Sequence, residues 1–212
     1  MGNFFDEPED EEIFFPLVSY KVYPCKRGFI EKFIEQNHYS GSINGCISDY
    51  CFALLRGTEL VGALFYGKLA MANQYKRFCV KENDITELRR LCCIDNTPRN
   101  TESYFISRTL KWLQKNTKLK MVVSYADAEY GHTGTIYRAS NFKYLGFSKG
   151  AKVIEYNGKL FHDKSIRTYY NGKLKPFAEE LKLALENGTA KYKSTKGKHT
   201  YIYYLIKQKS VI

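Results

Sequence analysis

The sequence lacks several features that would assign it to a common class of protein. No run of about 18 apolar residues occurs in the 212 residues, so we expect no transmembrane helix. None of the six cysteines forms a C-x-x-C pair, which argues against a zinc site or a disulfide framework. Adjacent Cys92 and Cys93 lie in an apolar run, as is typical of buried thiols in a reducing cytosol. We also expect no secretory signal, because the N-terminus is acidic.

Acidic residues are scarce outside one short segment. Residues 6–12 hold six acids and no base, and the rest of the chain carries 33 basic against 16 acidic residues, a net charge of +17. A segment this polar predicts a disordered tail, placed at residues 1–16, ahead of one domain over residues 17–212. A body this basic attracts a polyanion such as nucleic acid, although ribosomal or membrane-surface binding would give the same charge. The 18 tyrosines suit both strands and stacking on bases.

Apolar patterning predicts an α/β fold with a mixed sheet. Antiparallel hairpins come first, and a strand–helix–strand–helix unit follows. The turn signals are strongest at Arg56–Glu59 and at Asn157-Gly158. The expected strands are 18–23, 50–55, 60–66, 86–94, 120–125, 151–156, 159–162 and 198–206, and the expected helices are 29–36, 102–114, 134–145 and 175–186.

The densest group of polar residues follows the expected strand 120–125 and precedes a helix. Residues 124–134 read SYADAEYGHTG and include Asp127, Glu129 and His132. Ligands bind beyond the carboxyl ends of such strands, and loops on a rigid scaffold often carry sites. Two interpretations stay open: a functional site, or a polar loop in which Asp127 caps a backbone turn.

Several separated blocks of sequence resemble one protein family. They are NHYSG (37–41), ELRRL (87–91) followed by TPRNTES (97–103), VSYADAEYGHTGTIYRASNFKYLGF (123–147), NGKLFH (157–162) and KGKHTYIYYL (196–205). In this order they resemble the Mom family of phage DNA-modification proteins. The resemblance implies a GNAT-like fold, a mixed β-sheet flanked by helices, here with a C-terminal helix-strand extension. It also implies conversion of adenine in DNA to an N6-carbamoylmethyl form, which protects phage DNA from host restriction enzymes.

The resemblance also assigns candidate catalytic residues. The family's His-Tyr pair falls on His38 and Tyr39, its Asp on Asp127 and its helical Tyr on Tyr137. The N6 lone pair of adenine is delocalised into the ring, so an enzyme must place the amine and accept a proton, for which Asp127 is the candidate base. Tyr39 can stack on a base or donate a proton, and His38 can shuttle a proton or bind a metal. Because N6 is paired in double-stranded DNA, we expect the adenine to be flipped out.

The iron dependence proposed for the family makes Fe(II) a candidate cofactor. His38, Asp127 and His132 would supply two imidazoles and one carboxylate, a set that suits Fe(II). No H-x-D or H-x-x-x-H spacing accompanies them. His132 is as easily a loop residue bonded to the backbone.

A donor site is expected at the start of the helix 102–114. GNAT enzymes hold a pyrophosphate there on a Gly-rich turn, whereas residues 92–103 contain no glycine. Free N–H groups at a helix N-terminus still bind anions. The carrier stays open between an acyl-CoA and an aminoacyl carrier, and Asn100 serves alternatively as a simple helix cap. The expected donor-binding residues are Arg90, Arg99, Asn100, Thr101 and Ser103.

Basic residues late in the chain predict a DNA-facing surface. Between residues 191 and 209, six lysines and no acid alternate with tyrosines, a composition that suits phosphates and sugars. The leading prediction is a DNA-modifying transferase in the cytoplasm of an infected bacterial host, with no membrane partner and an open oligomeric state. An ordinary GNAT N-acyltransferase acting on a protein or small amine, or a non-catalytic DNA-binding protein, stays as an alternative. The expected DNA-binding residues are Arg138, Lys143, Lys164, Arg167, Lys198 and Tyr201.

Overall fold

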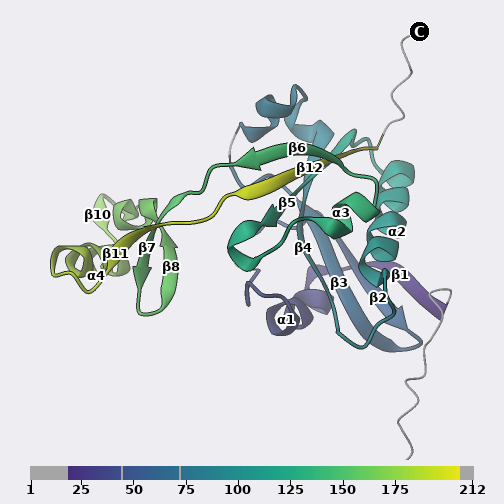
Figure 1. Ribbon diagram of the computed structural model, residues 1–212, viewed down its shortest axis with the longest axis horizontal. Coiled ribbons are helices and arrows are strands. Elements are labelled where there is room, and N and C mark those ends of the chain that lie inside the picture. The colour runs from purple at the N-terminus through teal and green to yellow at the C-terminus, as the bar shows by residue number, and fades with distance from the viewer. Residues whose placement is uncertain (1–18, 44, 72, 206–212) are drawn as a thin grey trace, which may run out of the picture. The chain divides into compact units, whose positions relative to one another are not determined.

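The computed structural model describes residues 19–43, 45–71 and 73–205 (Figure 1). The predicted acidic tail, residues 1–16, lies outside them. Of the described residues, a first compact unit holds those up to Ser124, with Ala139–Asn141 and those from Tyr203 onward, and a second holds Tyr125–Arg138 and Phe142–Ile202. The predicted single domain over residues 17–212 stays a prediction.

The first unit is built on a mixed sheet. Neighbouring strands are antiparallel from β1 to β4, whereas β4 and β5 run parallel over Ile85–Leu88 and Met121–Ser124. A parallel pair needs a crossover connection, which the helix α2 (Thr101–Asn116) provides. Two 3-10 helices, Gln74–Phe78 and Glu82–Asp84, precede β4. The strands are β1 (Tyr20–Cys25), β2 (Tyr50–Arg56), β3 (Glu59–Gly67), β4 (Ile85–Cys93) and β5 (Met121–Asp127).

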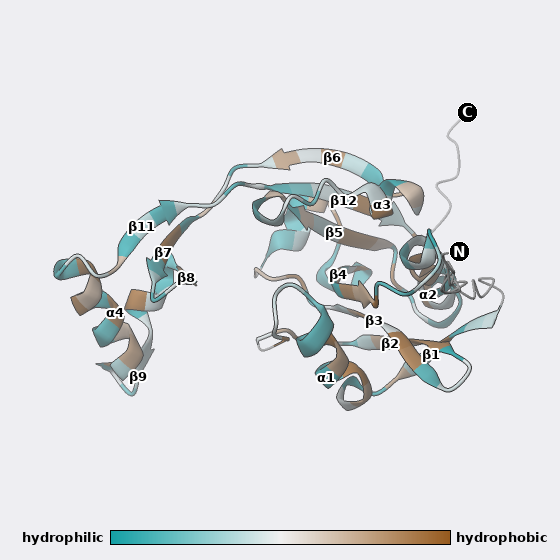
Figure 2. Cartoon of the chain, turned by 60° about the horizontal axis from the view of Figure 1, so that its bottom comes forward, coloured by the Kyte–Doolittle hydropathy of each residue, from teal (hydrophilic) through white to brown (hydrophobic). Residues whose placement is uncertain are grey.

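The helices α1 (Arg27–Asn37) and α2 cover opposite faces of this sheet (Figure 2). Successive side chains of a strand point to opposite faces. Phe65 on β3 packs in the cluster that contains Ile30 and Ile34 of α1. The next residue, Tyr66, shares a 2.7 Å hydrogen bond between its hydroxyl and that of Thr109 on α2. The predicted mixed sheet flanked by helices is therefore confirmed.

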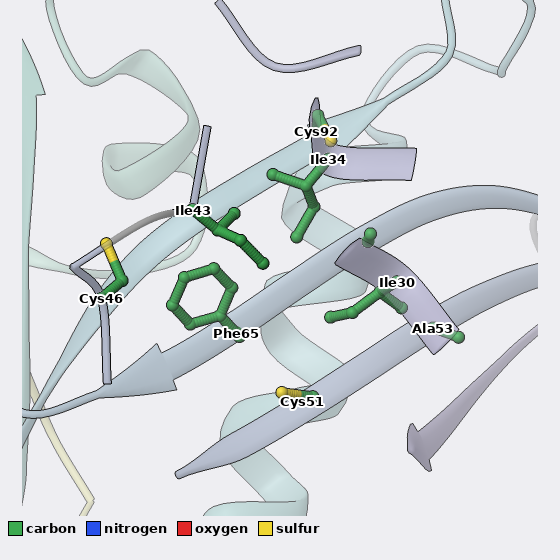
Figure 3. Packing of buried hydrophobic residues seen from close by; sticks show 9 residues of the cluster. Ile30, Ile34, Ile43, Cys46, Cys51, Ala53, Phe65 and Cys92 are labelled. Atoms are coloured by element: carbon green, nitrogen blue, oxygen red, sulfur yellow. The ribbon is translucent and has the colours of Figure 1, made fainter. Parts of the chain in front are cut away.

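The core beneath α1 is continuous with the loop that follows this helix. Figure 3 shows Ile30 and Ile34 beside the ring of Phe65, with Ile43 and Cys46 of the loop on the same cluster. The Phe65 side chain is fully buried. Folding of this loop onto the sheet therefore completes the core. The cluster consists of Ile30, Ile34, Ile43, Cys46, Cys51, Ala53, Ala63, Phe65 and Cys92.

The second unit begins at the carboxyl end of β5. Its strands β6 (Lys143–Ser148) and β12 (Lys198–Tyr204) pair antiparallel, with a β-bulge between Thr200 and Tyr201. The backbone N–H of Ala128, just after β5, donates to the carbonyl of Gly197, just before β12, at 3.2 Å. The loop after β5 is thus held by the chain that enters β12.

Residues 149–196 of the second unit, called the small lobe below, have a core of their own. The three-stranded sheet is ordered β11-β7-β8, and a buried cluster joins Ile154 of β7 to Leu181 and Ala184 of α4 (Pro176–Glu186). In Figure 2 hydrophobic and hydrophilic segments alternate along α4, as expected of a helix with one buried face. The predicted C-terminal helix-strand extension is confirmed. The remaining elements are β7 (Lys152–Tyr156), β8 (Lys159–His162), a 3-10 helix (Asp163–Arg167), β9 (Tyr169–Tyr170), β10 (Lys173–Leu174) and β11 (Lys191–Ser194).

One predicted helix is wrong. Residues 134–145 form only a short helix, α3 (Thr135–Ala139), and the chain then enters β6. Asn141 adopts a left-handed backbone (φ 62°), which ends the helix, and the residues after it pair with β12. The other predicted helices and strands form within a few residues of their expected bounds, except that Val18 and Ile206 lie outside the described residues. Within the described part of the chain, no helix is both long and apolar enough to cross a bilayer.

Removal of the Phe65 ring is expected to destabilise the first unit. Phe65→Ala leaves a cavity in a fully buried cluster, which costs about 3–5 kcal/mol in the free energy of unfolding. Phe29→Ala on α1 is the matched control, because its ring is 58% exposed. Urea unfolding followed by circular dichroism measures both, and equal stability of the two variants would contradict this packing.

Candidate active site

The turn after α1 orients His38. The N–H of His38 donates to the carbonyl of Ile34 at 2.9 Å and so ends the helix. The backbone N–H of Ser40 donates to Nδ1 of His38 at 3.1 Å, and the Ser40 hydroxyl lies 2.8 Å from the same nitrogen. Because Nδ1 accepts the backbone N–H of Ser40, we assign the ring proton of neutral His38 to Nε2. The neighbouring Tyr39 is 50% exposed, and its ring centre lies 4.2 Å from that of His38.

Arg90 is bonded to the same turn. Its Nε and one terminal nitrogen donate to the carbonyl of Ser42 at 3.4 and 3.3 Å, and the Ser40 hydroxyl donates to this carbonyl at 3.1 Å. His38, Ser40, Ser42 and Arg90 are thus connected by one continuous network of hydrogen bonds. Arg90, a predicted donor-binding residue, is a positioning residue for the His38 turn in this geometry.

Two further arginines bind the loop that follows. Arg27 donates to the carbonyls of Cys46 and Ile43 at 2.7 and 3.2 Å. Arg89 bonds the Cys46 sulfur at 3.3 Å and forms an ion pair with Glu87 at 3.3 Å. Burial lowers the pKa of Arg89, but the Glu87 carboxylate and Cys46 more than offset burial and leave that pKa raised. The loop is therefore held by three cations at once, here named the arginine clamp: Arg27, Arg89 and Arg90.

The loop before α2 makes its hydrogen bonds mainly to itself. Asn100 stands at the N-cap position with a left-handed backbone (φ 72°) and makes no side-chain capping bond. The hydroxyls of Thr101 and Ser103 donate to the carbonyls of Pro98 and Asn100 at 2.6 and 3.0 Å. Arg99 is exposed. Of the donor-binding residues predicted in this loop, Arg99 is thus the one that extends a cation into solvent.

In the second unit, each carboxylate oxygen of Asp127 makes a different contact. Its Oδ1 accepts the backbone N–H of Glu129 at 3.0 Å and caps the 3-10 helix Ala128–Tyr130. Its Oδ2 forms a 2.8 Å ion pair with the Nζ of Lys198 on β12. Each carboxylate oxygen still has acceptor capacity for a further donor. Two residues predicted separately, one as catalytic and one as DNA-binding, are therefore in direct contact.

The rest of this loop is fixed by β12 and the residues before it. Glu129 accepts the backbone N–H of Lys196 at 2.7 Å, and the Tyr201 hydroxyl donates to the carbonyl of Thr133 at 2.6 Å. The Tyr201 ring lies against Gly134 (φ +78°), where a Cβ atom would stand 2.2 Å from that ring. Only glycine fits at this position without displacing Tyr201. The backbone N–H of His132 donates to the Asp127 carbonyl at 3.2 Å.

Tyr137 lies in a buried aromatic cluster. It is 8% exposed, and its ring centre is 5.4 Å from that of Tyr201 and 5.6 Å from that of Phe142. Tyr201 is 1% exposed, so its hydroxyl and ring support the loop instead of facing solvent. Burial makes a direct DNA contact by Tyr201 incompatible with this arrangement.

The proposed Fe(II) ligand set does not fit the structure. Among residues 19–43, 45–71 and 73–205, no three His, Cys, Asp or Glu side chains form a group that could hold a metal ion. Asp127 is engaged by Lys198 and Glu129, and Nδ1 of His38 is engaged by Ser40. His38, Asp127 and His132 therefore do not form the predicted Fe(II) site among the described residues.

Comparison with known proteins gives the family. The model of the Mom protein family matches residues 19–211. The chain belongs to the Mom protein family. The protein named methylcarbamoylase mom, from Escherichia phage Mu, is 31% identical over 143 residues, which are 66% of this chain and 58% of that relative. The matched part thus spans less than two thirds of the relative's length.

Solved structures support the fold of this Mom family member. Arabidopsis thaliana NAA60 in complex with acetyl-CoA aligns with a TM-score of 0.51 and 11% identity over 87% of this chain and 98% of NAA60. A probable acetyltransferase from Staphylococcus epidermidis aligns with a TM-score of 0.50 and 9% identity over 87% of this chain and 98% of that structure. The likeness shows an acetyltransferase fold, as the sequence blocks predict.

Sequence reasoning gave no role to two residues that hold the candidate site residues in place. Ser40 holds His38, and Glu129 holds the backbone before β12. A serine two residues after a histidine is a local signal for such a bond, whereas the partner of Glu129 is 67 residues away. The remaining predicted DNA-binding residues are exposed in the second unit: Arg138, Lys143, Lys164 and Arg167.

Most cysteines of the chain are protected from reaction by burial. Burial raises the pKa of Cys92 to about 12 and, with the nearby Cys51, that of Cys25 to about 11. Burial also raises the pKa of Cys93 well above its ordinary value. The thiolate is the reactive form, so these thiols are unreactive near neutral pH. Cys79, in contrast, is exposed.

The arginine clamp predicts a local effect of Arg90→Lys. A lysine cannot bond the Ser42 carbonyl through two nitrogens, so the turn at residues 38–42 should open more often. Hydrogen exchange followed by mass spectrometry should show faster exchange in peptides covering residues 38–46 and unchanged exchange in β3. Arg108→Lys, on the exposed side of α2, is the control, and equal exchange in both variants would argue against the clamp.

Thiol labelling tests the burial of the cysteines. At pH 8 the native protein should react with a disulfide reagent first at Cys79, and Cys79→Ser should remove this fast phase. The denatured wild-type chain should release the signal of all six thiols. A fast phase that survives in Cys79→Ser would mean that a buried thiol is accessible.

Proposed function

We propose that this protein transfers a carbamoylmethyl-type group to N6 of adenine in DNA, which protects the DNA from restriction enzymes. Its membership of the Mom protein family over residues 19–211 carries the proposal. The name of the phage Mu relative, a methylcarbamoylase, supports the type of group transferred. The reaction would take place in the cytoplasm of an infected bacterium, where the DNA to be modified lies.

Asp127 is the proposed acceptor of the N6 proton. The amine becomes nucleophilic only as a proton leaves, since its lone pair is delocalised into the ring. The Asp127 carboxylate is held in place by Glu129 N–H and Lys198 and retains capacity for one more donor. Its orientation is therefore fixed before substrate binds, which reduces the entropic cost of proton transfer.

His38 is the proposed proton donor. With Nδ1 engaged by Ser40, we assign exchange with the substrate to Nε2, which carries the proton in the neutral ring. A donor at this position can stabilise negative charge that develops on the oxygen of the transferred group or on a leaving group. Tyr39, half exposed beside this ring, is the proposed stacking surface for a flipped adenine.

The loop before α2 is the proposed binding site for the donor. Backbone N–H groups of the first turn of α2, with Arg99, would hold an anionic carrier. Arg90 acts indirectly, through the His38 turn, and Asn100, Thr101 and Ser103 shape the loop through backbone bonds. NAA60, which has this fold, was solved with acetyl-CoA, and this supports an acyl-CoA as one candidate beside an aminoacyl carrier. Tyr137, buried among aromatic rings, is proposed to position the loop of Asp127.

Mass spectrometry of nucleosides from plasmid DNA tests the proposal. Bacteria that express the wild-type chain should yield a heavier deoxyadenosine derivative. Asp127→Asn should abolish it while keeping the turn, because an amide oxygen can still accept the Glu129 N–H. Glu179→Gln, an exposed acid of α4, is the control and should leave modification unchanged.

Two outcomes of this experiment contradict different parts of the proposal. Unmodified DNA in cells that contain soluble wild-type protein would contradict the function itself. Full modification by Asp127→Asn would keep the function and remove Asp127 from the role of proton acceptor.

A further inference from the structure

We infer that the β9–β10 hairpin of the small lobe binds duplex DNA by inserting into a groove. The inference rests on the proposed function, since it names a second contact between the protein and the same DNA. The hairpin lies outside every block that resembles the Mom family and was not predicted from the sequence.

The hairpin is a narrow two-stranded ribbon with a tight turn. Asn171 and Gly172 connect Tyr170 to Lys173 with positive φ angles of 50° and 74°, the geometry of a two-residue hairpin turn. The N–H of Lys175 donates to the carbonyl of Thr168 at 2.9 Å and extends the pairing by one step. The major groove of B-DNA, about 12 Å wide, admits a two-stranded ribbon of this kind.

The register places an aromatic and a basic side chain on one face of the ribbon. Tyr170 stands directly opposite Lys173, and residues that are opposite each other share a face. The Nζ of Lys175 lies 6.0 Å from the centre of the Tyr170 ring. A depression of about 740 Å³ adjoins the hairpin and is lined by Tyr170, Asn171, Lys173, Leu174, Lys175 and Pro176.

Both tyrosines are exposed to an extent that a role in the core does not explain. Tyr169 is 63% and Tyr170 is 68% exposed, and neither belongs to the buried cluster of the small lobe. Their rings therefore contribute little to folding, and their flat apolar surfaces with hydroxyl groups suit contact with bases and sugars.

Charge favours a polyanion as the partner. The small lobe holds eleven Lys or Arg and five Asp or Glu, a net charge of +6. No acid occurs from Lys164 to Ala178, which includes the whole hairpin. Two of the acids elsewhere in the lobe are paired with its own cations, Asp163 with Arg167 and Glu155 with Lys193. The hairpin is thus a part of the lobe where positive charge and exposed rings coincide, with no acid nearby in sequence.

Binding of a labelled DNA duplex, measured by fluorescence anisotropy over a series of salt concentrations, tests the inference on the full chain. The double variant Lys173→Ala/Lys175→Ala should bind more weakly, and the slope of log affinity against log salt should become shallower by about 0.9 for each lost phosphate contact. Tyr169→Ala/Tyr170→Ala should weaken binding by about fivefold or more and leave this slope unchanged.

The matched control removes two charges elsewhere in the lobe. Lys159→Ala/Lys182→Ala changes exposed lysines on β8 and α4 and should retain the wild-type slope. Circular dichroism confirms that each variant is folded. If the hairpin pair and the control pair behave alike, the inference is overturned. It is also overturned if the hairpin variants lose affinity for an RNA probe while duplex DNA binding is unchanged.

Failure of the proposed function is separable from failure of this inference. Nucleoside analysis of DNA exposed to the wild-type chain reports the function alone. Unmodified DNA together with weakened binding by the hairpin variants would support the DNA contact and contradict the proposed reaction. Modified DNA together with unchanged binding by the hairpin variants would support the proposed reaction and contradict this DNA contact.

Discussion

The arginine clamp determines how the loop after α1 packs onto the sheet of the first unit. Backbone carbonyls of an irregular loop have no ladder partners, and such groups are costly when they are removed from water without a hydrogen bond. Arg27 and Arg90 satisfy three of these carbonyls, of Cys46, Ile43 and Ser42. The satisfied loop can then bury Ile43 and Cys46 against Phe65 and hold His38 through Ser40. Core packing and orientation of the proposed proton donor thus depend on the same cations.

In the second unit, the carboxylate of Asp127 holds an irregular loop in a comparable way. Asp127 caps the turn after β5 through one oxygen and pairs with Lys198 through the other. The structural and the functional interpretation of this residue are therefore compatible, because capping fixes the orientation that proton transfer needs. Tyr201 adds a second restraint by filling the space above Gly134. A polar loop rich in candidate groups is in this way held rigid by its contacts with one strand.

Local signals in the sequence were sufficient for much of the fold, and non-local pairing explains the errors. Two apolar runs joined by a turn predicted β2 and β3, and Asn157-Gly158 predicted the β7–β8 hairpin. The helix 134–145 was wrong because Phe142 and Leu145 have helical spacing, whereas β6 forms by pairing with β12 some fifty residues later. Asn171-Gly172 carries the same turn signal as Asn157-Gly158, but only two residues pair on each side, too few for alternation to be visible. The partner of Arg90 is a backbone carbonyl, which no residue pattern specifies.

The proposed reaction makes two different demands on the chain, and the structure meets them with differently exposed residues. Affinity for any DNA sequence comes from exposed cations, whose attraction to phosphates is screened by salt. Chemistry at one base needs groups whose orientation is fixed, as at His38 and Asp127, which are partly buried and bonded on more than one side. Lys198 has an exposed side chain, yet its ion pair belongs to the second group. Substitution of a hairpin lysine should therefore act on affinity, whereas substitution of Lys198 should also disturb the carboxylate that is proposed to accept the proton.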